Sequence, residues 1–330
     1  MKTLRNISKL LKVAIVASTF ISTTILVSGA VQAEEYPTKP VKLMVGWSAG
    51  GSTDVYARSL ASFVNDYLGM PMVVVNKPGA SGMIAGKAAM AARPDGYTLY
   101  VQSGGTFVTR MRIDGEKSLV SAYDDFQPLG SIGKVVTGLI VPIDSPFQTA
   151  ADLVEFAKAN PGKLRWANPG RGSLHTLSGR IFLKGNDIQA QDVPFKGGSK
   201  ARNAVAGKQV DFGFMGISLL AGFGEKLRAL GVTDGQRDAI YVDVPTFGEQ
   251  GLPQMAISSP LIIWGQKDLP APIVAKLTKA IAEAAQSKGY NKMVRKTGVA
   301  GFYSTPEESL VMVKELDEIV TPVVNEFFHN

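Results

Sequence analysis

Short runs of β-branched and aliphatic residues alternate with amphipathic segments along almost the whole chain after residue 40. Residues 41–45 predict a strand, and residues 53–68 predict a helix because Leu60, Val64 and Leu68 recur at helical spacing. A chain that alternates strands and helices folds into a largely parallel sheet covered by helices. This alternation predicts an α/β fold.

The same reading extends to the end of the chain. Further strands are predicted at residues 72–75, 98–101, 138–141, 164–167, 192–195, 210–215, 227–232 and 261–265. Further helices are predicted at residues 83–92, 149–159, 173–184, 199–206, 271–286 and 306–328. A proline at position 322 should break or kink the last of these helices.

The length of 330 residues suggests two lobes. Two short irregular stretches, 127–137 and 241–260, are the candidates for crossings between them. A chain that crosses twice builds its first lobe from both ends of the sequence. We therefore expect one lobe at 34–136 and 253–330, a second lobe at 137–252, and a ligand cleft with two hinge strands between them.

The first 33 residues have the pattern of a secretory signal peptide: a basic start, an apolar stretch at 13–29, and small residues before a cleavage point after Ala33. A retained membrane anchor is the alternative, but an apolar run of about 17 residues barely spans a bilayer. Four of the 35 basic residues and none of the 28 acidic residues lie in this segment, so the mature chain carries 31 basic and 28 acidic groups. That balance argues against a nucleic-acid partner, and export without cysteines indicates the bacterial periplasm or the outer face of the envelope.

Composition excludes several kinds of site. The chain has no cysteine, which rules out disulfides, thiolate metal sites and a cysteine nucleophile, and it has only two histidines. Neither a P-loop nor a dinucleotide-binding glycine motif is present. We therefore expect no metal site and no cofactor.

The informative residues follow the predicted strands. In the first such loop, Gly50 and Gly51 let the backbone approach a ligand and adopt positive φ, and the helix that follows offers unpaired N–H groups. That combination suits an anion, although a tight turn capped by Ser52 or Thr53 would look the same. On the second reading Asp54 only complements the helix dipole.

Similar glycine-rich loops occur at residues 76–82, 103–106, 168–173 and 196–199. In open α/β sheets such loops lie at the carboxyl ends of strands, where ligands bind. We expect loops from both lobes to converge on one cleft and to bind an anion through backbone donors. A ligand-binding site of this kind needs no catalytic residue.

An enzymatic alternative rests on residues 46–50, GWSAG, which match the G-x-S-x-G nucleophile motif of α/β-hydrolases. His175 is the candidate base, because His329 is the penultimate residue. No His-Gly-Gly-Gly segment precedes the motif to form an oxyanion hole. The second hypothesis is thus a secreted serine hydrolase that uses Ser48 and His175.

Seven motifs in this chain together resemble those of the Bug family, the extracytoplasmic solute receptors of tripartite tricarboxylate transporters. They are YPTKPV at 36–41, AGGSTD at 49–54, NKPGASG at 76–82, PDGYT at 94–98, ANPGKL at 159–164, VPFKGG at 193–198 and GKQVD at 207–211. The resemblance covers the mature chain. It implies a type II periplasmic-binding-protein fold without catalysis, and a small organic acid as ligand.

The resemblance also assigns candidate ligand-binding residues: Trp47, Ser48, Ala49, Gly50, Gly51, Ser52, Asp54, Ser103, Thr106, Gly170, Arg171, Gly172, Ser173, His175, Lys196, Gly197, Gly198 and Met215. Many relatives have an aspartate where this chain has Met215, so recognition of an amino group is not expected there. Trp47 and Met215 favour a bulkier or more apolar acid. Arg171 either faces solvent or reaches a second carboxylate.

The ligand is expected to be a dicarboxylate, a tricarboxylate or an aromatic carboxylate. The expected partners are the membrane components of a tripartite tricarboxylate-type transporter, and the protein itself is expected to be a monomer. A sensor domain that hands its liganded form to a signalling partner is a third reading. Gly51→Val should abolish binding, because a β-branched side chain would crowd the anion and could not adopt positive φ.

Overall fold

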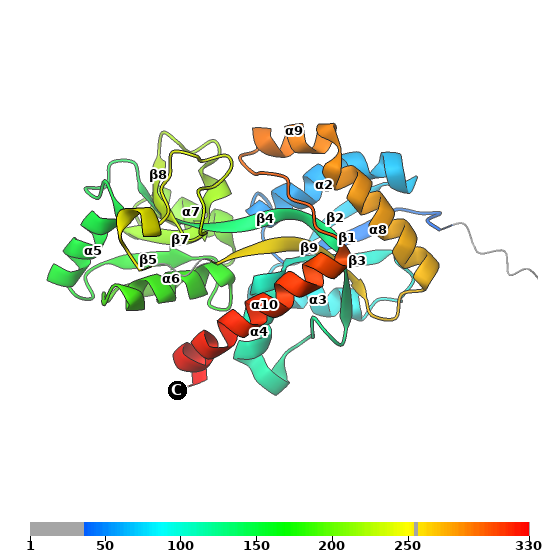
Figure 1. The fold of residues 1–330 in the computed structure, drawn as a ribbon, viewed down its shortest axis with the longest axis horizontal. Coiled ribbons are helices and arrows are strands. Elements are labelled where there is room, and N and C mark those ends of the chain that lie inside the picture. Colours follow the sequence, from blue (N-terminus) through cyan, green and yellow to red (C-terminus); the bar gives the residue numbers. More distant parts are fainter. Residues whose placement is uncertain (1–35, 254–256, 330) are drawn as a thin grey trace, which may run out of the picture. The chain divides into compact units, whose positions relative to one another are not determined.

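A nine-stranded mixed sheet with helices packed against it forms the part of the chain that this computed structural model describes, residues 36–253 and 257–329 (Figure 1). From Lys39 onward the chain is a single compact unit. The predicted signal segment, residues 1–33, lies outside the described residues. The α/β fold class predicted from the alternation of strands and helices is confirmed.

The strands are β1 (Val41–Val45), β2 (Met72–Asn76), β3 (Thr98–Ser103), β4 (Phe126–Pro142), β5 (Arg165–Asn168), β6 (Gln191–Pro194), β7 (Phe212–Gly216), β8 (Leu227–Val232) and β9 (Ser258–Gln266). The helices are α2 (Ser52–Leu68), α3 (Met83–Met90), α4 (Gly104–Asp114), α5 (Ala150–Ala159), α6 (Leu174–Gly185), α7 (Gly198–Ala206), α8 (Ala271–Gln286), α9 (Lys288–Lys296) and α10 (Pro306–Val324).

The strand order is β2-β1-β3-β9-β4-β7-β5-β6, and β8 pairs with β4 beside this path. The pairs β1–β2, β1–β3, β5–β6 and β5–β7 are parallel, whereas β3–β9, β9–β4, β4–β7 and β4–β8 are antiparallel. Each end of the sheet is thus a small parallel unit covered by helices. These two units are the lobes of the fold.

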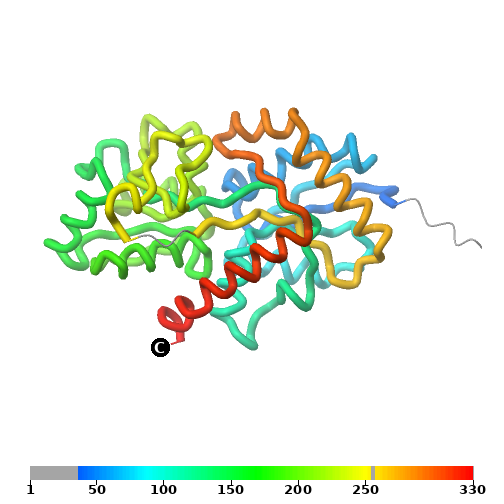
Figure 2. The backbone as a smooth tube through the Cα atoms, viewed as in Figure 1, coloured from blue at the N-terminus to red at the C-terminus, as the bar shows by residue number. Residues whose placement is uncertain are grey.

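Strand β4 joins the lobes. Its first part, residues 126–136, pairs with β9, and residues 137–142 pair with β7 and β8. Figure 2 shows β4 and β9 running side by side between the lobes. The sequence reading of residues 127–137 as irregular was wrong. Glycines mislead there: Gly133 is required because a Cβ atom would lie 2.2 Å from the Tyr56 ring of α2.

Three further elements differ from expectation. Helix α4 begins directly after β3, where only a loop was expected, and Ser103 caps it by accepting a hydrogen bond from the Thr106 amide. Helix α9 was not anticipated. Helix α10 continues through Pro322 to Val324, so the proline does not break it. The Glu318 carbonyl, which would accept from residue 322 in a regular helix, loses that partner, and Glu318 is exposed to solvent.

Each lobe has an aromatic core. In the first lobe Phe107 packs edge-to-face on Trp264, with ring centroids 5.2 Å apart. In the second lobe Phe214 packs edge-to-face on Trp166 at 5.8 Å. Such pairs stabilise a core by about 0.5–1.5 kcal/mol beyond their buried area. The rings pack helix α4 on strand β9 in the first lobe and strand β5 beside strand β7 in the second.

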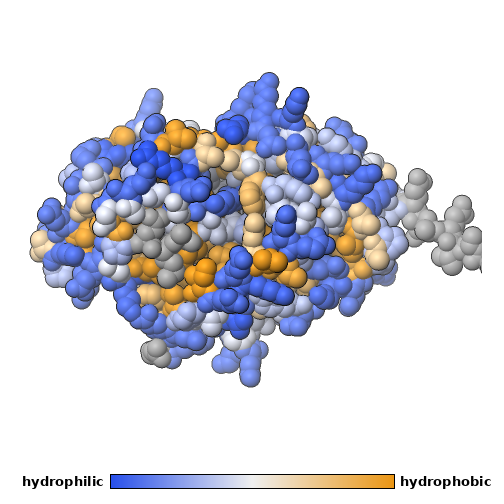
Figure 3. Space-filling view, in the orientation of Figure 1, coloured by the Kyte–Doolittle hydropathy of each residue, from blue (hydrophilic) through white to orange (hydrophobic). Residues whose placement is uncertain are grey.

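Polar and charged side chains cover most of the face seen in Figure 3, with apolar patches between them. Val311 and Ile319 on α10 are among the exposed apolar residues. Within residues 36–253 and 257–329, every helix is too short or too polar to traverse a lipid bilayer.

Candidate functional site: a cavity at four helix N-termini

Four helices of the described chain, α2, α4, α6 and α7, begin around one cavity of about 40 Å³. Two of these helices belong to each lobe. The cavity is lined by Trp47, Gly51, Ser52, Thr53, Gln102, Ser103, Thr106, Val135, Pro169, His175, Gly198, Gly216 and Leu219. Sequence segments more than 150 positions apart therefore meet at this cavity.

The electrostatics of the cavity come from backbone and hydroxyl groups. Each helix start carries unpaired N–H groups and a partial positive charge of roughly half an elementary charge. The lining contains no Asp, Glu, Lys or Arg. An anion placed here would be solvated by oriented dipoles without a competing carboxylate.

The first loop is held by a buried carboxylate. Asp54, which is 3% exposed, accepts a hydrogen bond from the Gly50 amide at 2.9 Å, another from Asn76 at 2.8 Å, and an ion pair from Arg58 at 3.0 Å. Burial alone would raise the pKa of Asp54, but these donors outweigh burial and lower it. Asp54 is thus charged and supports the loop from behind instead of lining the cavity.

The two glycines of this loop have different conformations. Gly50 adopts φ +75°, which L side chains rarely adopt, whereas Gly51 has φ −81°. The expectation that Gly51 needs positive φ was wrong, because the turn places its left-handed residue one position earlier. Gly51 contributes instead by lining the cavity as the N-cap of α2.

Trp47 is oriented by Gln102, a residue that the sequence reading did not single out. The Trp47 indole donates to Gln102 Oε1 at 3.1 Å, and the Ser103 amide donates to the same oxygen at 3.1 Å. Gln102 Nε2 in turn donates to the Ser81 carbonyl at 2.8 Å. This fully buried amide therefore fixes three of the glycine-rich loops relative to one another.

Helices α4 and α6 meet at their first turns, across the lobes. Thr106 Oγ1 accepts a hydrogen bond from the Leu174 amide at 3.2 Å. Ser173 caps α6 by accepting from the Thr176 amide, just as Ser103 caps α4. At the starts of α4 and α6, hydroxyl oxygens thus already accept hydrogen bonds from some of the backbone amides. A separation of α4 from α6 would leave the Leu174 amide without its Thr106 partner.

His175 lies in the first turn of α6, and its Nδ1 is 2.6 Å from Thr137 Oγ1 on β4. Desolvation by burial lowers the pKa of His175 to about 4. The ring is therefore neutral at pH 7 and presents a hydrogen-bonding group, not a charge, to the cavity.

Ser48 and His175 have different hydrogen-bond partners. Ser48 Oγ lies 3.3 Å from the Lys196 carbonyl and 3.2 Å from Ser199 Oγ, at the start of α7. His175 is hydrogen-bonded to Thr137. The geometry joins Ser48 to the opposite lobe and does not assemble a serine–histidine pair.

Seven of the candidate residues line the cavity: Trp47, Gly51, Ser52, Ser103, Thr106, His175 and Gly198. Ser48, Ala49 and Lys196 meet at the rim, where Ser199 Oγ donates to the Ala49 carbonyl at 3.4 Å. Gly197 packs against Ser48, Gly170 against Ser81, and Gly172 against Arg110.

Met215 and Arg171, like Asp54, do not line the cavity. Met215 is 0% exposed and packs in the core beneath β7, although Gly216 beside it lines the cavity. Arg171 is exposed at the surface. Besides Gln102, the sequence reading missed Thr53, Val135, Pro169, Gly216 and Leu219 as lining residues. Pro169 and Thr53 belong to glycine-rich loops that the sequence analysis had selected, so the sequence could have identified these two residues.

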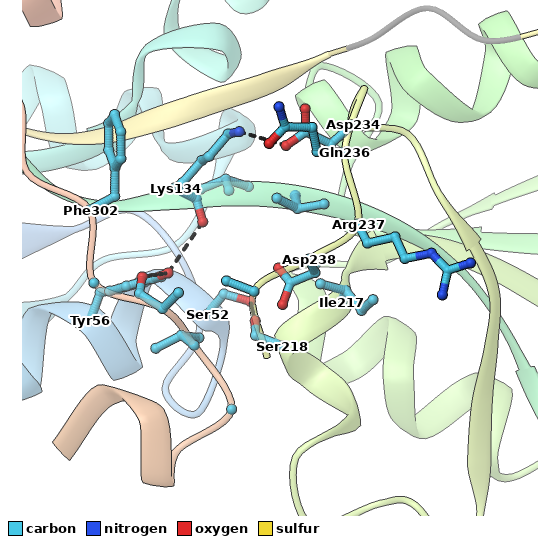
Figure 4. Close-up of a pocket in the computed structure, with 18 residues that line it drawn as sticks. Ser52, Tyr56, Lys134, Ile217, Ser218, Asp234, Gln236, Arg237, Asp238 and Phe302 are labelled. Atoms are coloured by element: carbon cyan, nitrogen blue, oxygen red, sulfur yellow. Dashed lines mark hydrogen bonds and ion pairs between the residues drawn. The ribbon is translucent and has the colours of Figure 1, made fainter. Parts of the chain in front are cut away.

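A larger cavity of about 190 Å³ adjoins the first and shares Ser52, Val135 and Gly216 with it (Figure 4). Lys134 and Asp234, which form an ion pair at 2.6 Å, lie on its wall. Across the described residues, no group of three or more His, Asp or Glu side chains is arranged to hold a metal ion.

The chain matches the family model "Tripartite tricarboxylate transporter family receptor" over residues 56–326. Protein BugT of Bordetella pertussis is 29% identical over 285 residues, which cover 86% of this chain and 87% of BugT. A solved R. palustris protein with adipate has a TM-score of 0.82 and 26% identity, covering 88% of this chain and 98% of that one. MatC from Rhodopseudomonas palustris with bound malate has a TM-score of 0.80 and 26% identity, and the match covers 88% of this chain and 100% of MatC.

The two-lobe fold is that of the periplasmic binding proteins, the class to which the solved protein BugD belongs. Within that class, the chain belongs to the receptor family of tripartite tricarboxylate transporters and is related to the Bug proteins. The family consists of solute receptors and is not a family of enzymes.

Proposed function

We propose that this protein is an exported receptor that captures a small organic carboxylate and delivers it to the membrane components of a tripartite tricarboxylate-type transporter. The observation that carries the proposal is the convergence of four helix N-termini, two from each lobe, on one cavity without a charged side chain. Oriented amides stabilise an anion without a counter-charge, and the solved relatives with adipate and malate support this ligand class.

The proposed mechanism is binding coupled to lobe closure. The lobes would be residues 34–136 with 253–330, and residues 137–252, moving about strands β4 and β9. A ligand carboxylate that touches helix starts of both lobes binds the closed form better than the open form, and so shifts the population towards closure. The transporter would read the closed form of a monomeric receptor in the periplasm, after cleavage behind Ala33.

The proposed ligand-binding set is the seven cavity-lining candidates together with Thr53, Gln102, Pro169, Gly216 and Leu219. Ser48, Lys196 and Gly197 would close the rim. The contacts of Ser48 and His175 do not favour the serine hydrolase, because Ser48 is hydrogen-bonded to Ser199 and His175 to Thr137.

Calorimetric titration of the purified protein with mono-, di-, tri- and aromatic carboxylates tests the proposal, with the corresponding neutral amides as controls. At least one acid should bind while its amide does not, because an amide lacks the negative charge. Thr106→Val, which removes a hydroxyl from the cavity wall, should weaken binding roughly threefold to tenfold. If no acid in the panel binds, the proposal is wrong. Labelling by a fluorophosphonate that is lost in Ser48→Ala would instead support the hydrolase.

A further inference from the structure

The cavity at the helix starts is small. Its volume of about 40 Å³ holds about three water molecules, at roughly 10–15 Å³ for each. This is room for one carboxylate group and little more. The rest of a larger ligand has to extend into a neighbouring cavity, and two cavities adjoin this one along Ser52.

The first neighbour, with about 190 Å³, does not suit a second anion. Lys134 is already paired with Asp234, and Arg237 is paired with Glu249 at 3.0 Å. Figure 4 shows the Asp238 carboxylate among the residues around the cavity, while the Arg237 side chain extends away from it. An anionic group placed here would face a carboxylate.

The second neighbour has about 320 Å³, and the charged residues in its lining are all positive. Arg202 of α7 and Lys296 of α9 line it, one from each lobe, and no Asp or Glu does. Neither cation has an ion-pair partner within residues 36–253 and 257–329. Ser52 and Leu219 belong to the walls of both this cavity and the small one.

Arg202 is held in place rather than free in solvent. Its guanidinium lies 3.8 Å from the centroid of the Phe223 ring, and its Nε and Nη2 donate to Asn203 Oδ1 at 3.3 Å. Burial without a carboxylate partner lowers the pKa of Arg202. A bound anion would supply the missing counter-charge.

We propose that Arg202 and Lys296 form a second anion subsite, which selects ligands with a second carboxylate. This inference rests on the function proposed above and specifies its ligand class as dicarboxylates. One carboxylate occupies the helix starts, the chain passes Ser52 and Leu219, and the other carboxylate meets the two cations. Because Arg202 and Lys296 come from different lobes, the second carboxylate also favours closure.

Titrations with matched acids test the subsite: succinate, glutarate and adipate against butyrate, valerate and hexanoate. The wild-type protein should bind at least one dicarboxylate roughly tenfold or more tightly than the monocarboxylate of equal length. Arg202→Gln should weaken that dicarboxylate roughly 10- to 100-fold and leave monocarboxylates within about threefold. Lys296→Gln, on an exposed residue, should cost roughly twofold to fivefold.

Lys158→Gln is the matched control, since it removes one exposed charge from α5, and Lys158 lines none of the three cavities. If Arg202→Gln does not fold, the subsite is tested by Lys296→Gln alone, through its affinity for the paired mono- and dicarboxylates. Equal affinity of wild type for paired mono- and dicarboxylates, or an equal loss for both in Arg202→Gln, overturns the subsite while leaving the proposed receptor function intact. Absence of binding to every acid contradicts the receptor function itself.

Discussion

The hydroxyl oxygens of Ser52 and Ser218 lie 2.7 Å apart, although 166 positions separate the two residues in the chain. Ser52 begins α2 in the first lobe, and Ser218 lies in the short 3-10 helix Ile217–Leu220 of the second. The contact stands where the three neighbouring cavities meet, because Ser52 lines all of them. In the proposed mechanism this contact would link lobe closure to the space available to a ligand.

A double-mutant cycle on this pair should show coupling. Ser52→Ala and Ser218→Ala should each weaken carboxylate binding by about 0.5–1.5 kcal/mol, because the hydrogen bond contributes to the closed form that binds. The double variant should lose no more than about the larger single loss. Calorimetry measures all four proteins, and fully additive losses would show that the contact does not contribute to closure.

Asp54→Asn should lower the free energy of unfolding by about 1–3 kcal/mol, because the charged acceptor of the Gly50, Asn76 and Arg58 donors is lost. Urea denaturation measures the change. Asp66→Asn is the control on the same helix, since Asp66 is exposed, and it should stay within about 0.5 kcal/mol of wild type. An equal effect of both substitutions would contradict the supporting role of Asp54.

Gly50→Ala should lower the free energy of unfolding by about 1–2 kcal/mol. No atom lies within 4 Å of the added Cβ, so the loss comes only from forcing alanine to φ +75°. Gly51→Val should instead leave the lobe folded and weaken binding at least roughly tenfold, because its side chain stands at the cavity wall. Thermal melts with and without ligand separate the two effects, and a Gly51→Val protein with wild-type affinity would move the site elsewhere.

Trp47 should report ligand binding by its fluorescence. Trp166 and Trp264 are 1% and 0% exposed in the two cores, whereas Trp47 lines the cavity. A bound carboxylate should change the emission of wild type and leave that of Trp47→Phe unaltered. Persistence of the full signal in Trp47→Phe would mean that ligand reaches a different tryptophan.

The stability of the protein should depend on pH through His175. The pKa of the His175 imidazole is about 4 in the folded chain and 6.5 for an ordinary histidine, as in the unfolded chain. Between pH 6.5 and pH 4, therefore, only the unfolded chain gains a proton at this residue. The free energy of unfolding should thus fall as pH drops from 6.5 to 4, by up to on the order of 3 kcal/mol. Urea denaturation should show a shallower decline in His175→Gln; parallel pH profiles would contradict the assignment.

The local pattern of apolar residues was sufficient to give the bounds of some segments. The predicted helix 271–286 and strand 227–232 have those bounds in the structure. It failed where glycine serves tertiary packing. Gly104 and Gly105 have low helix propensity, yet they begin α4, because Ser103 caps the helix and Phe107 and Val108 bury its apolar side. Gly133 made β4 look irregular for a similar reason, since it accommodates Tyr56.

The sequence by itself determined the α/β alternation, the family, and the loops around which a ligand site could form, because each of these depends on residues that are close together in the chain. Only the tertiary structure decided which loops face one another, that Asp54 supports the turn from behind, and that Met215 is buried in the core. The pairing of Ser48 with Ser199, 151 positions away, has no local signature. Contacts between lobes depend on how β4 joins the two parallel units of the sheet, which no short stretch of the chain encodes.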